Sequence, residues 1–280
     1  MLINTYKQNE SRPMGFGDFI RGCVSCYQLS KDENFKFEID LGHASEFFSE
    51  KTFYVKKDKK ITLLQNKGTY EDVKRLIYKN INKNWKHLNN FNFYVFTNVW
   101  PKYTQDNNHK DWGYIDIDVK NFIKDKLRPS KILLKEYEHI KDPFEIIHIR
   151  AGDPHSFNAA PEHESFQQPS LKRIRNSVLG ELVEIYKQTD NHLLILSDSN
   201  DVKNEFKIIK EAFNLDRLII LNNKPQHSGV NISIDTLHDF LHMANSKKIH
   251  QMSVYDWGSG FSNIAHHIYD VPIIRYEKII

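Results

Sequence analysis

The sequence predicts an α/β protein with two lobes, each built around a parallel sheet. Two observations lead to this fold class. Short apolar runs typical of strands alternate with helical patterns of about 10–15 residues, which is typical of βαβ units. The 280 residues also divide into two lobes of about 140 residues, close to the usual size of a domain. We therefore expect one Rossmann-like lobe at 1–140, another at 141–280, and a central cleft that both sheets face.

Composition indicates a globular protein. Hydrophobic residues make up 40% and aromatic residues 12% of the chain, and the net charge is only +3, so intrinsic disorder is excluded. Lysines are scattered among acidic residues, whereas nucleic-acid-binding proteins cluster them on one face, so no nucleic-acid partner is expected. No apolar run reaches the ~20 residues of a membrane span. The N-terminus lacks the apolar run of a signal peptide and two cysteines cannot form a disulfide framework, so we expect a cytoplasmic location.

In the first lobe, a mostly apolar stretch follows Gly15-Phe16-Gly17 and predicts a helix. Residues 35–41 alternate like a half-buried strand, and residues 91–96 are rich in aromatic side chains, which favours a second strand. The elements expected here are a helix at 16–29, strands at 35–41 and 60–64, a helix at 70–82, a strand at 91–96 and a helix at 121–127.

In the second lobe, the strand pattern at 144–150 stops at Ala151-Gly152-Asp153-Pro154, and residues 191–196 form the short apolar run typical of a buried parallel strand. The charged stretch 131–142 is the expected linker between the lobes. The other elements expected are helices at 170–188, 200–213, 234–245 and 262–269, and strands at 217–221 and 248–253.

The most specific motif is His148-Ile149-Arg150-Ala151-Gly152-Asp153, at the end of a predicted strand. Ligands of open α/β sheets bind outside the carboxyl ends of the strands. An arginine there offers two parallel hydrogen bonds to a phosphate, and glycine lets the backbone approach closely. A β-turn with an incidental Arg–Asp pair explains this motif equally well in isolation.

Two further stretches of the same lobe favour a ligand site. Ser197-Asp198 places a carboxylate at the end of another strand, and the Gly/Ser-rich turn 257–263 opens a helix, whose N-terminal N–H groups hold phosphate well. Ser259 and Ser262 add hydroxyl groups, although plain N-capping also explains such serines. Together these stretches supply a guanidinium, a phosphate cradle and a carboxylate that can read a base, as a nucleoside diphosphate requires.

A further glycine-rich turn lies in the first lobe, at Gly15-Phe16-Gly17-Asp18 with Arg21-Gly22 following. It lacks the glycine spacing of a dinucleotide fingerprint, and the sequence contains no Gly-Lys-Ser/Thr phosphate loop. By itself this turn is only a weak indication of a nucleotide site.

These motifs resemble those of the fucosyltransferase superfamily, which includes the α-1,2-, α-1,6- and protein O-fucosyltransferases. The strand end at 148–153 is similar to the His-x-Arg-x-x-Asp motif of this superfamily, and Ser197-Asp198 is similar to its second motif. The turn at 259–263 is similar to its third motif, a Ser-x-Phe-Ser turn before a helix. Asp235-x-Leu237-x-Asp239-Phe240 and the Gly15 turn also fit. The resemblance covers most of 144–272 and about 30 residues of the first half. It implies a GT-B fold, a GDP-fucose donor as substrate, inversion at the sugar, and no metal or other cofactor.

The resemblance also implies roles for individual residues. Arg150 would hold the β-phosphate and stabilise charge on the departing GDP, a form of electrostatic catalysis. His148 and Asp198 would contact the guanine and ribose. The serines and N–H groups of the third motif would hold the phosphates. The full donor site is then Gly15, Gly17, Asp18, Arg21, His148, Gly152, Asp153, Asp198, Ser259, Gly260, Phe261 and Ser262.

The sequence departs from the family in two respects. Ala151 stands where many relatives have a second arginine, for which Arg21 or Arg12 is a substitute from the first lobe. The general base is unassigned, and Glu162 and Glu164 are its candidates, although solvated loop charges explain them equally well. We expect a bacterial or viral glycosyltransferase of the cytoplasm that acts on a glycan acceptor. A non-catalytic nucleotide- or glycan-binding relative is the alternative.

Three other patterns favour structural roles. Cys23 and Cys26 have redox spacing but lie inside an apolar helix, so buried thiols are expected. His238 and His242 have the spacing of a zinc-hydrolase helix without a clear third ligand, which leaves a zinc hydrolase as a remote alternative. Asp116-x-Asp118 resembles a metal motif, but an alternating segment at 114–119 predicts the solvent face of a strand.

Overall fold

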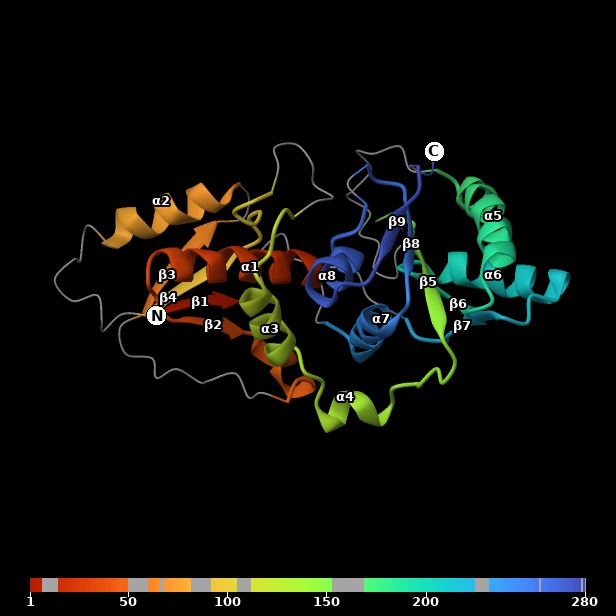
Figure 1. Cartoon of the computed structure of the whole chain (residues 1–280), viewed down its shortest axis with the longest axis horizontal. Coiled ribbons are helices and arrows are strands. Elements are labelled where there is room, and N and C mark those ends of the chain that lie inside the picture. Colours follow the sequence, from red (N-terminus) through yellow and green to blue (C-terminus); the bar gives the residue numbers. More distant parts are fainter. Residues whose placement is uncertain are drawn as a thin grey trace. The chain divides into compact units, whose positions relative to one another are not determined.

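The computed structural model describes residues 1–6, 15–49, 60–65, 68–81, 92–104, 112–152, 169–224, 232–256, 258–277 and 279. The chain divides into two compact units, Met1–Lys135 and Glu136–Ile280, whereas the sequence predicts the division at 140/141. In Figure 1 the first unit runs from red to yellow-green and the second from green to blue. Each unit contains a parallel sheet with helices, which confirms the predicted α/β fold class.

The first unit has a four-stranded sheet in the order β2-β1-β4-β3, with all three neighbouring pairs parallel. Its strands are β1 (Leu2–Thr5), β2 (Phe37–Asp40), β3 (Lys60–Gln65) and β4 (Asn92–Thr97). Its helices are α1 (Phe16–Asp32), the 3₁₀ helix η1 (Gly42–Phe47), α2 (Tyr70–Ile81), α3 (Ile117–Lys126) and α4 (Lys131–Lys135).

Helix α1 packs closely on the two central strands because a glycine and an asparagine face each other there. A Cβ atom on Gly22 would lie 1.9 Å from the carbonyl oxygen of Thr97 at the end of β4, so any larger residue would push the helix away. Asn4 of β1 is fully buried; its amide donates to the carbonyl oxygens of Phe19 and Thr97, and its oxygen accepts from the N–H of Thr97. A buried polar residue thus joins helix and sheet.

The second unit has a five-stranded parallel sheet in the order β7-β6-β5-β8-β9. The chain moves outward from β5 to β7, then returns to β8 on the other side of β5, so the strand order reverses between β5 and β8. Its strands are β5 (Phe144–Arg150), β6 (His192–Ser197), β7 (Leu218–Ile220), β8 (Ile249–Ser253) and β9 (Ile273–Arg275). Its helices are α5 (Leu171–Gln188), α6 (Asn200–Phe213), α7 (Ile234–Asn245) and α8 (Gly260–Tyr269).

Two hydrophobic cores cover the two faces of this second sheet. Figure 1 shows α5 and α6 on one side of the strands and α7 and α8 on the other. The first core joins Ile147 and Ile195 of the sheet to Val178 of α5 and Phe206 of α6. The second core joins alternate strand residues, such as Ile146 and Leu194, to α7 and α8. Because alternate residues face opposite sides, a strand between the two cores can be apolar in a continuous run, as at residues 193–196 of β6.

Serine residues begin all four helices of the second unit. Each serine lies at the N-cap, and its side chain accepts a hydrogen bond from an N–H of the first turn: Ser170 from Arg173, Ser199 from Val202, Ser233 from Thr236 and Ser259 from Phe261. Such a cap replaces a hydrogen bond that the helix itself cannot make.

Several sequence predictions differ from the structure. Residues 114–119 do not form a strand; Asp116 is the N-cap of α3, and Val119 and Ile123 are buried at helical spacing. The predicted linker 131–142 begins with the short helix α4, in which Leu133 is buried. Strands β1 and β9 were not predicted.

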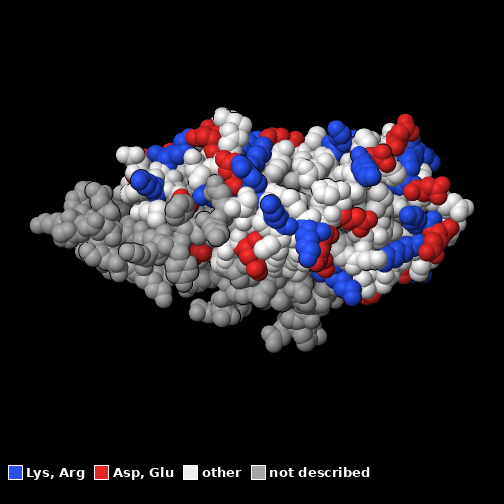
Figure 2. Space-filling model, turned by 90° about the horizontal axis from the view of Figure 1, so that it is seen from below, with Lys and Arg blue, Asp and Glu red and all other residues white. Residues whose placement is uncertain are grey.

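The surface carries both signs of charge. On the face shown in Figure 2, basic and acidic side chains are interspersed over the described residues. Among the helices of the described residues, none has the length and apolar character needed to cross a membrane.

Candidate functional site

Arg150 and Asp198 meet at the carboxyl ends of two neighbouring strands. Arg150 is the last residue of β5, and Asp198 directly follows β6. The guanidinium forms an ion pair with one carboxylate oxygen of Asp198, and the other oxygen accepts a hydrogen bond of 2.8 Å from the N–H of Ala151. The side chains of Arg150 and Asp198 are only 12% and 13% exposed, so Asp198 fixes the direction of the guanidinium. The ring of Tyr255 lies 5.4 Å from that guanidinium.

His148 lies two residues before Arg150 in β5, so both side chains are on the same face of the sheet, and His148 contacts helix α8. Its Nδ1 lies 3.1 Å from the hydroxyl of Ser262. The side chain is buried, and burial, together with the nearby charge of Arg150, lowers the pKa of His148 to about 3. His148 is therefore a neutral imidazole at ordinary pH, and it acts as a hydrogen-bonding group rather than as a charge.

The side chain of Gln251 in β8 holds the turn between β8 and α8 through hydrogen bonds. The Nε2 of Gln251 donates to the hydroxyl of Ser262 and to the carbonyl oxygen of Ser259 at 3.3 Å. Gly258 has φ of +72°, and a Cβ atom there would lie 2.2 Å from the Gln251 side chain. Glycine is therefore required at this position by both backbone conformation and space.

Helix α8 begins at this turn, beside the point where the strand order reverses. Ser259 is its N-cap, and Gly260, Phe261 and Ser262 form its first turn. Arg150 of β5 is in register with Ser253 at the end of β8, so the turn after β8 and the end of β5 share one edge of the sheet. Helix N-termini attract anions through their N–H groups and dipole, and such reversal points are where open α/β sheets bind ligands.

Gly152 follows Ala151 with φ of +99°, a conformation that glycine adopts without strain. Ala151 is fully buried in the core beneath α5 and α6. An arginine side chain would not fit that buried position without rearrangement. Asp153, Glu162 and Glu164 lie outside the described residues.

The predicted residues of the first lobe gather at the start of α1. Gly15 is the N-cap of α1, and Gly17 is buried in its first turn. Asp18 and Arg21 form an ion pair of 3.0 Å. The guanidinium of Arg21 also donates 2.9 Å to the carbonyl oxygen of Asn98 and lies 3.8 Å from the ring of Trp100. Burial lowers the pKa of Arg21, and Asp18 opposes that shift. The contacts with Asp18, Asn98 and Trp100 all lie within the first unit and hold Arg21 in place.

A polar cluster that the sequence analysis did not single out as a unit lies on the same edge of the second sheet. Lys203 of α6, Asn223 after β7 and Asp239 of α7 form a hydrogen-bonded chain. Its signal in the sequence was Asp239 itself, which belongs to the Asp235-x-Leu237-x-Asp239 pattern. The lysine gave no signal because its position on α6 matches an ordinary amphipathic helix.

The surroundings of the remaining candidate residues, Cys23, Cys26 and His242, indicate structural roles. Cys23 and Cys26 are buried, as predicted. Both ring nitrogens of His242 contact backbone carbonyl oxygens, Nδ1 that of His238 at 2.8 Å and Nε2 that of Glu138 at 2.9 Å. A zinc ion would need one of these two nitrogens, and each already has a carbonyl oxygen as its partner, which argues against the zinc-hydrolase alternative. Within the described residues, no cluster of three or more His, Cys, Asp or Glu side chains could hold a metal ion.

The second unit thus places a fixed guanidinium, a helix N-terminus, a neutral histidine and buried carboxyl groups along one edge of a sheet. Anionic phosphate fits the first two, because arginine offers paired donors and the helix offers backbone N–H groups. The carboxyl groups suit the N–H donors of a base. This set of groups can bind a nucleoside diphosphate.

Comparisons with known proteins agree on the fold. No protein-family model matches the sequence, and no curated protein matches it either. Solved structures do match. A structure of NodZ alpha-1,6-fucosyltransferase soaked with GDP-fucose has a TM-score of 0.57 at 12% identity, over 98% of this chain and 94% of that chain.

Two further structures give the same result. Fucosyltransferase NodZ from Bradyrhizobium has a TM-score of 0.54 at 10% identity, over 98% of this chain and 95% of that one. POFUT1 in complex with GDP-fucose has a TM-score of 0.52 at 10% identity, over 99% of this chain and 97% of that one. These structures confirm the fold that the resemblance implies: over nearly its whole length, the chain shares the GT-B fold of these fucosyltransferases.

Proposed function

We propose that the protein is a glycosyltransferase that transfers fucose from GDP-fucose to a hydroxyl group of a glycan acceptor. The observation that carries this proposal is the fixed pair of Arg150 and Asp198 beside the N-terminus of α8, at the reversal point of the second sheet. The fold of the GDP-fucose-bound structures supports the donor. We assign the donor to the second unit and the acceptor to the first. The cytoplasm is the proposed location.

The proposed reaction inverts the sugar and requires no metal ion. The acceptor oxygen attacks the anomeric carbon of fucose while the bond from that carbon to the β-phosphate oxygen breaks, and the acceptor proton passes to a general base. Negative charge then develops on the departing GDP. Arg150 stabilises this charge, and because Asp198 already orients the guanidinium, little reorganisation is needed at the transition state. Glu162 and Glu164 are the proposed bases.

The other residues divide between phosphates and nucleoside. Ser259, Gly260, Phe261 and Ser262 are proposed to hold the phosphates through the first turn of α8. His148 is proposed for the guanine and ribose region, together with Gly152 and Asp153. The role of Gly15, Gly17, Asp18 and Arg21 of the first unit in donor binding stays a prediction.

Asp239 adds a carboxyl group on the side of the base. Both oxygens of Asp198 already bind groups of the protein, the guanidinium of Arg150 and the N–H of Ala151. Asp239 is buried on α7, and the next residue, Phe240, has its ring 6.1 Å from that of Phe261. Phe261 in turn lies 6.4 Å from His148. We therefore assign the reading of the base to Asp239 and the orientation of Arg150 to Asp198.

A second candidate function is a binding protein without transferase activity. The specific observation in its favour is Ala151, which is buried where many family members carry a second arginine and so leaves one phosphate-binding charge fewer. A binder and an enzyme both bind the donor, but only an enzyme releases GDP from it.

A thermal-shift series with nucleotides tests the donor. Ligand binding to the folded state raises the melting temperature by mass action. We expect GDP and GDP-fucose to stabilise the protein, and UDP, ADP and CMP to have little effect. Equal shifts by all nucleotides contradict a guanine-specific donor site. Release of GDP from GDP-fucose on incubation with the protein then distinguishes the transferase from the binder.

A further inference from the structure

Lys203, Asn223 and Asp239 form a polar cluster. Lys203 lies in the first turn of α6, only five residues after Asp198, and Asp239 lies in the middle of α7. Lys203 and Asp239 are each only 2% exposed. Charged side chains are almost never buried to this degree unless they are paired or hydrogen-bonded, so this cluster has to provide partners for both charges.

Asn223 connects the two charged groups. The ammonium group of Lys203 donates to the backbone oxygen of Asn223 at 2.7 Å and to its side-chain oxygen at 3.3 Å. The Nδ2 of Asn223 donates to Oδ1 of Asp239. The amide can face only one way, because its oxygen must point to the ammonium group and its NH₂ to the carboxylate. The lysine therefore sets the orientation of the asparagine, which in turn fixes one oxygen of the carboxylate.

The charges around Asp239 act in opposite directions. Burial raises the pKa of Asp239 to about 7; Lys203 lowers this pKa, Asp235 of the same helix raises it, and the hydrogen bond from Asn223 lowers it. Burial lowers the pKa of Lys203, which Asp239 and Asp235 oppose and which Lys207 lowers further. The carboxyl group is thus near the midpoint of its titration at neutral pH, where the loss of one nearby positive charge changes its state.

We propose that Lys203 is a positioning residue for donor recognition: through Asn223 it orients the carboxylate of Asp239 and keeps it available as an acceptor for the N–H groups of a guanine base. The inference rests on the proposed function, and it adds a residue that touches neither the donor nor the reacting atoms. An ionised carboxylate accepts two hydrogen bonds from adjacent N–H groups, as on the edge of guanine. A protonated carboxyl group loses one of these acceptors and would favour a different base.

The decisive variant is Lys203→Met, which keeps most of the side-chain volume and removes the charge. We expect the pKa of Asp239 to rise by at least about one unit, because its main cationic neighbour is lost. The ionised fraction of Asp239 at pH 7 should then fall from about one half to about one eleventh, so GDP affinity at pH 7 should fall at least about fivefold and recover towards pH 9. In the wild type, GDP affinity should rise with pH around the pKa of Asp239.

Lys207→Met is the matched control. Lys207 lies one turn further along α6. In an exposed position, its ammonium group donates a hydrogen bond of 2.8 Å to the side-chain oxygen of Asn222. It should leave both the GDP affinity and its dependence on pH unchanged. Asp239→Asn should weaken GDP binding and remove the dependence on pH. Should Lys203→Met fail to fold, Asn223→Ser interrupts the same chain while keeping the lysine.

Two measurements separate the inference from the proposed function. Calorimetric titration with GDP between pH 6 and 9 reports donor binding, and ¹³C NMR of the Asp239 carboxyl group reports its pKa without any nucleotide. If wild-type protein binds no GDP at any pH, the proposed function is wrong and donor recognition by this cluster is wrong with it. If the wild type binds GDP but Lys203→Met leaves the carboxyl pKa and the affinity profile at those of Lys207→Met, only the positioning role of Lys203 is overturned.

Discussion

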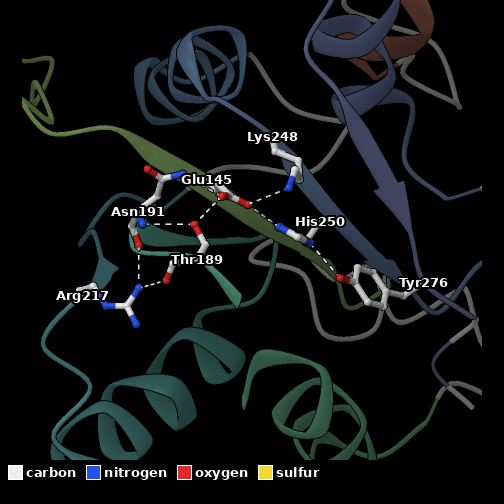
Figure 3. A network of polar contacts seen from close by, with 7 residues as sticks. All are labelled: Glu145, Thr189, Asn191, Arg217, Lys248, His250 and Tyr276. Atoms are coloured by element: carbon white, nitrogen blue, oxygen red, sulfur yellow. Dashed lines mark hydrogen bonds and ion pairs between the residues drawn. The ribbon is translucent and has the colours of Figure 1, made fainter. Parts of the chain in front are cut away.

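The two ends of strand β5 carry polar residues with different surroundings. Near the beginning, the carboxylate of Glu145 accepts hydrogen bonds from Thr189 at 2.7 Å, Asn191 at 2.8 Å and Nε2 of His250 at 2.7 Å, and Lys248 lies 3.7 Å away. Figure 3 shows that these groups converge on one carboxylate from several segments. At the other end, Arg150 pairs with Asp198 in the turn directly after β6.

The network around Glu145 extends in both directions across the sheet. The Nδ1 of His250 accepts from the hydroxyl of Tyr276 at 2.9 Å, and Arg217 donates to the backbone oxygens of Thr189 and Asn191 (Figure 3). Burial lowers the pKa of His250 although Glu145 opposes it, so a neutral ring serves both partners, with one N–H donated and one nitrogen accepting.

Buried charge thus has two uses in one sheet. At the amino end it joins strands, a loop and the C-terminal segment, and we expect its loss to reduce stability. At the carboxyl end it stands beside a helix N-terminus and a reversal of strand order, where a ligand can add partners. Mutations at the two ends should therefore affect different measurements.

The largest effect is expected for Glu145→Ala. This change leaves His250, Thr189 and Asn191 without their acceptor in a buried place, and each buried group left without a hydrogen bond costs about 1–3 kcal/mol. Urea unfolding should show this loss in the free energy of unfolding. GDP affinity of the protein that remains folded should be unchanged; a selective loss of GDP binding without loss of stability would contradict the division between the two ends.

Acid should remove the same contribution from the wild type. Burial alone would raise the pKa of Glu145, but the hydrogen bonds from His250, Thr189 and Asn191 outweigh it and lower the pKa from 4.5 to about 2. The stabilisation is therefore present above pH 4.5 and is lost as the pH falls towards 2. Thermal unfolding at pH 7, 4 and 2.5 should show the stability of wild type and Glu145→Gln converging as the pH falls.

Next in size is Arg150→Ala, at the other end of the strand. Loss of a group that stabilises charge in the transition state costs about 10²–10³-fold in rate, so transfer from GDP-fucose should fall by that factor. Arg150→Lys keeps the charge but not the paired donors, and should recover only part of the activity. Transfer at near wild-type rate by Arg150→Ala, measured by GDP release, would refute the phosphate-binding role.

Ser259→Ala tests the helix N-terminus with a smaller effect. Loss of the cap should cost about 0.5–2 kcal/mol of stability, and GDP should bind more weakly because the first turn of α8 is less ordered. Ser170→Ala, at the N-cap of α5, is the matched control, since it removes an equivalent cap from a helix that carries no proposed site residue. Equal GDP affinity in the two variants, measured by calorimetry, would exclude the α8 N-terminus from the site.

The smallest effect is expected for Tyr276→Phe. It removes one hydrogen bond, that to Nδ1 of His250, and keeps the ring, so it should cost about 0.5–1.5 kcal/mol in the free energy of unfolding. GDP release from GDP-fucose should be unaffected. A loss above 3 kcal/mol, close to that of Glu145→Ala, would mean that the network acts as one cooperative unit.

The helices of the second unit were the most predictable elements of the sequence. The patterns at 200–213 and 234–245 match α6 and α7 at both ends, because amphipathic spacing and serine caps coincide there. Strand β1 is short and contains Asn4, a polar residue that is buried only because α1 and β4 supply its partners. Such a strand cannot be recognised until its tertiary partners are known.

The site was predictable in its positions but less so in its contacts. Motifs at strand ends indicated that Arg150, Asp198 and the turn at Ser259 share one edge of the sheet, because carboxyl ends of parallel strands lie together. The ion pair of Arg150 with Asp198 depends on the register of β5 and β6, which the sequence alone does not specify. The connection of Lys203 to Asp239 through Asn223 could not be predicted from the sequence either, because the two charged residues lie 36 residues apart on different helices.

The two buried cysteines have a practical consequence. Both cysteines of the chain, Cys23 and Cys26, lie inside α1 in the first unit, and burial raises the pKa of each thiol. A thiol with a raised pKa and no solvent contact does not react with alkylating reagents until the helix opens. The rate of alkylation therefore reports the opening of the first unit alone. Alongside a spectroscopic measure of the whole chain, it would show whether the two units unfold together or one after the other.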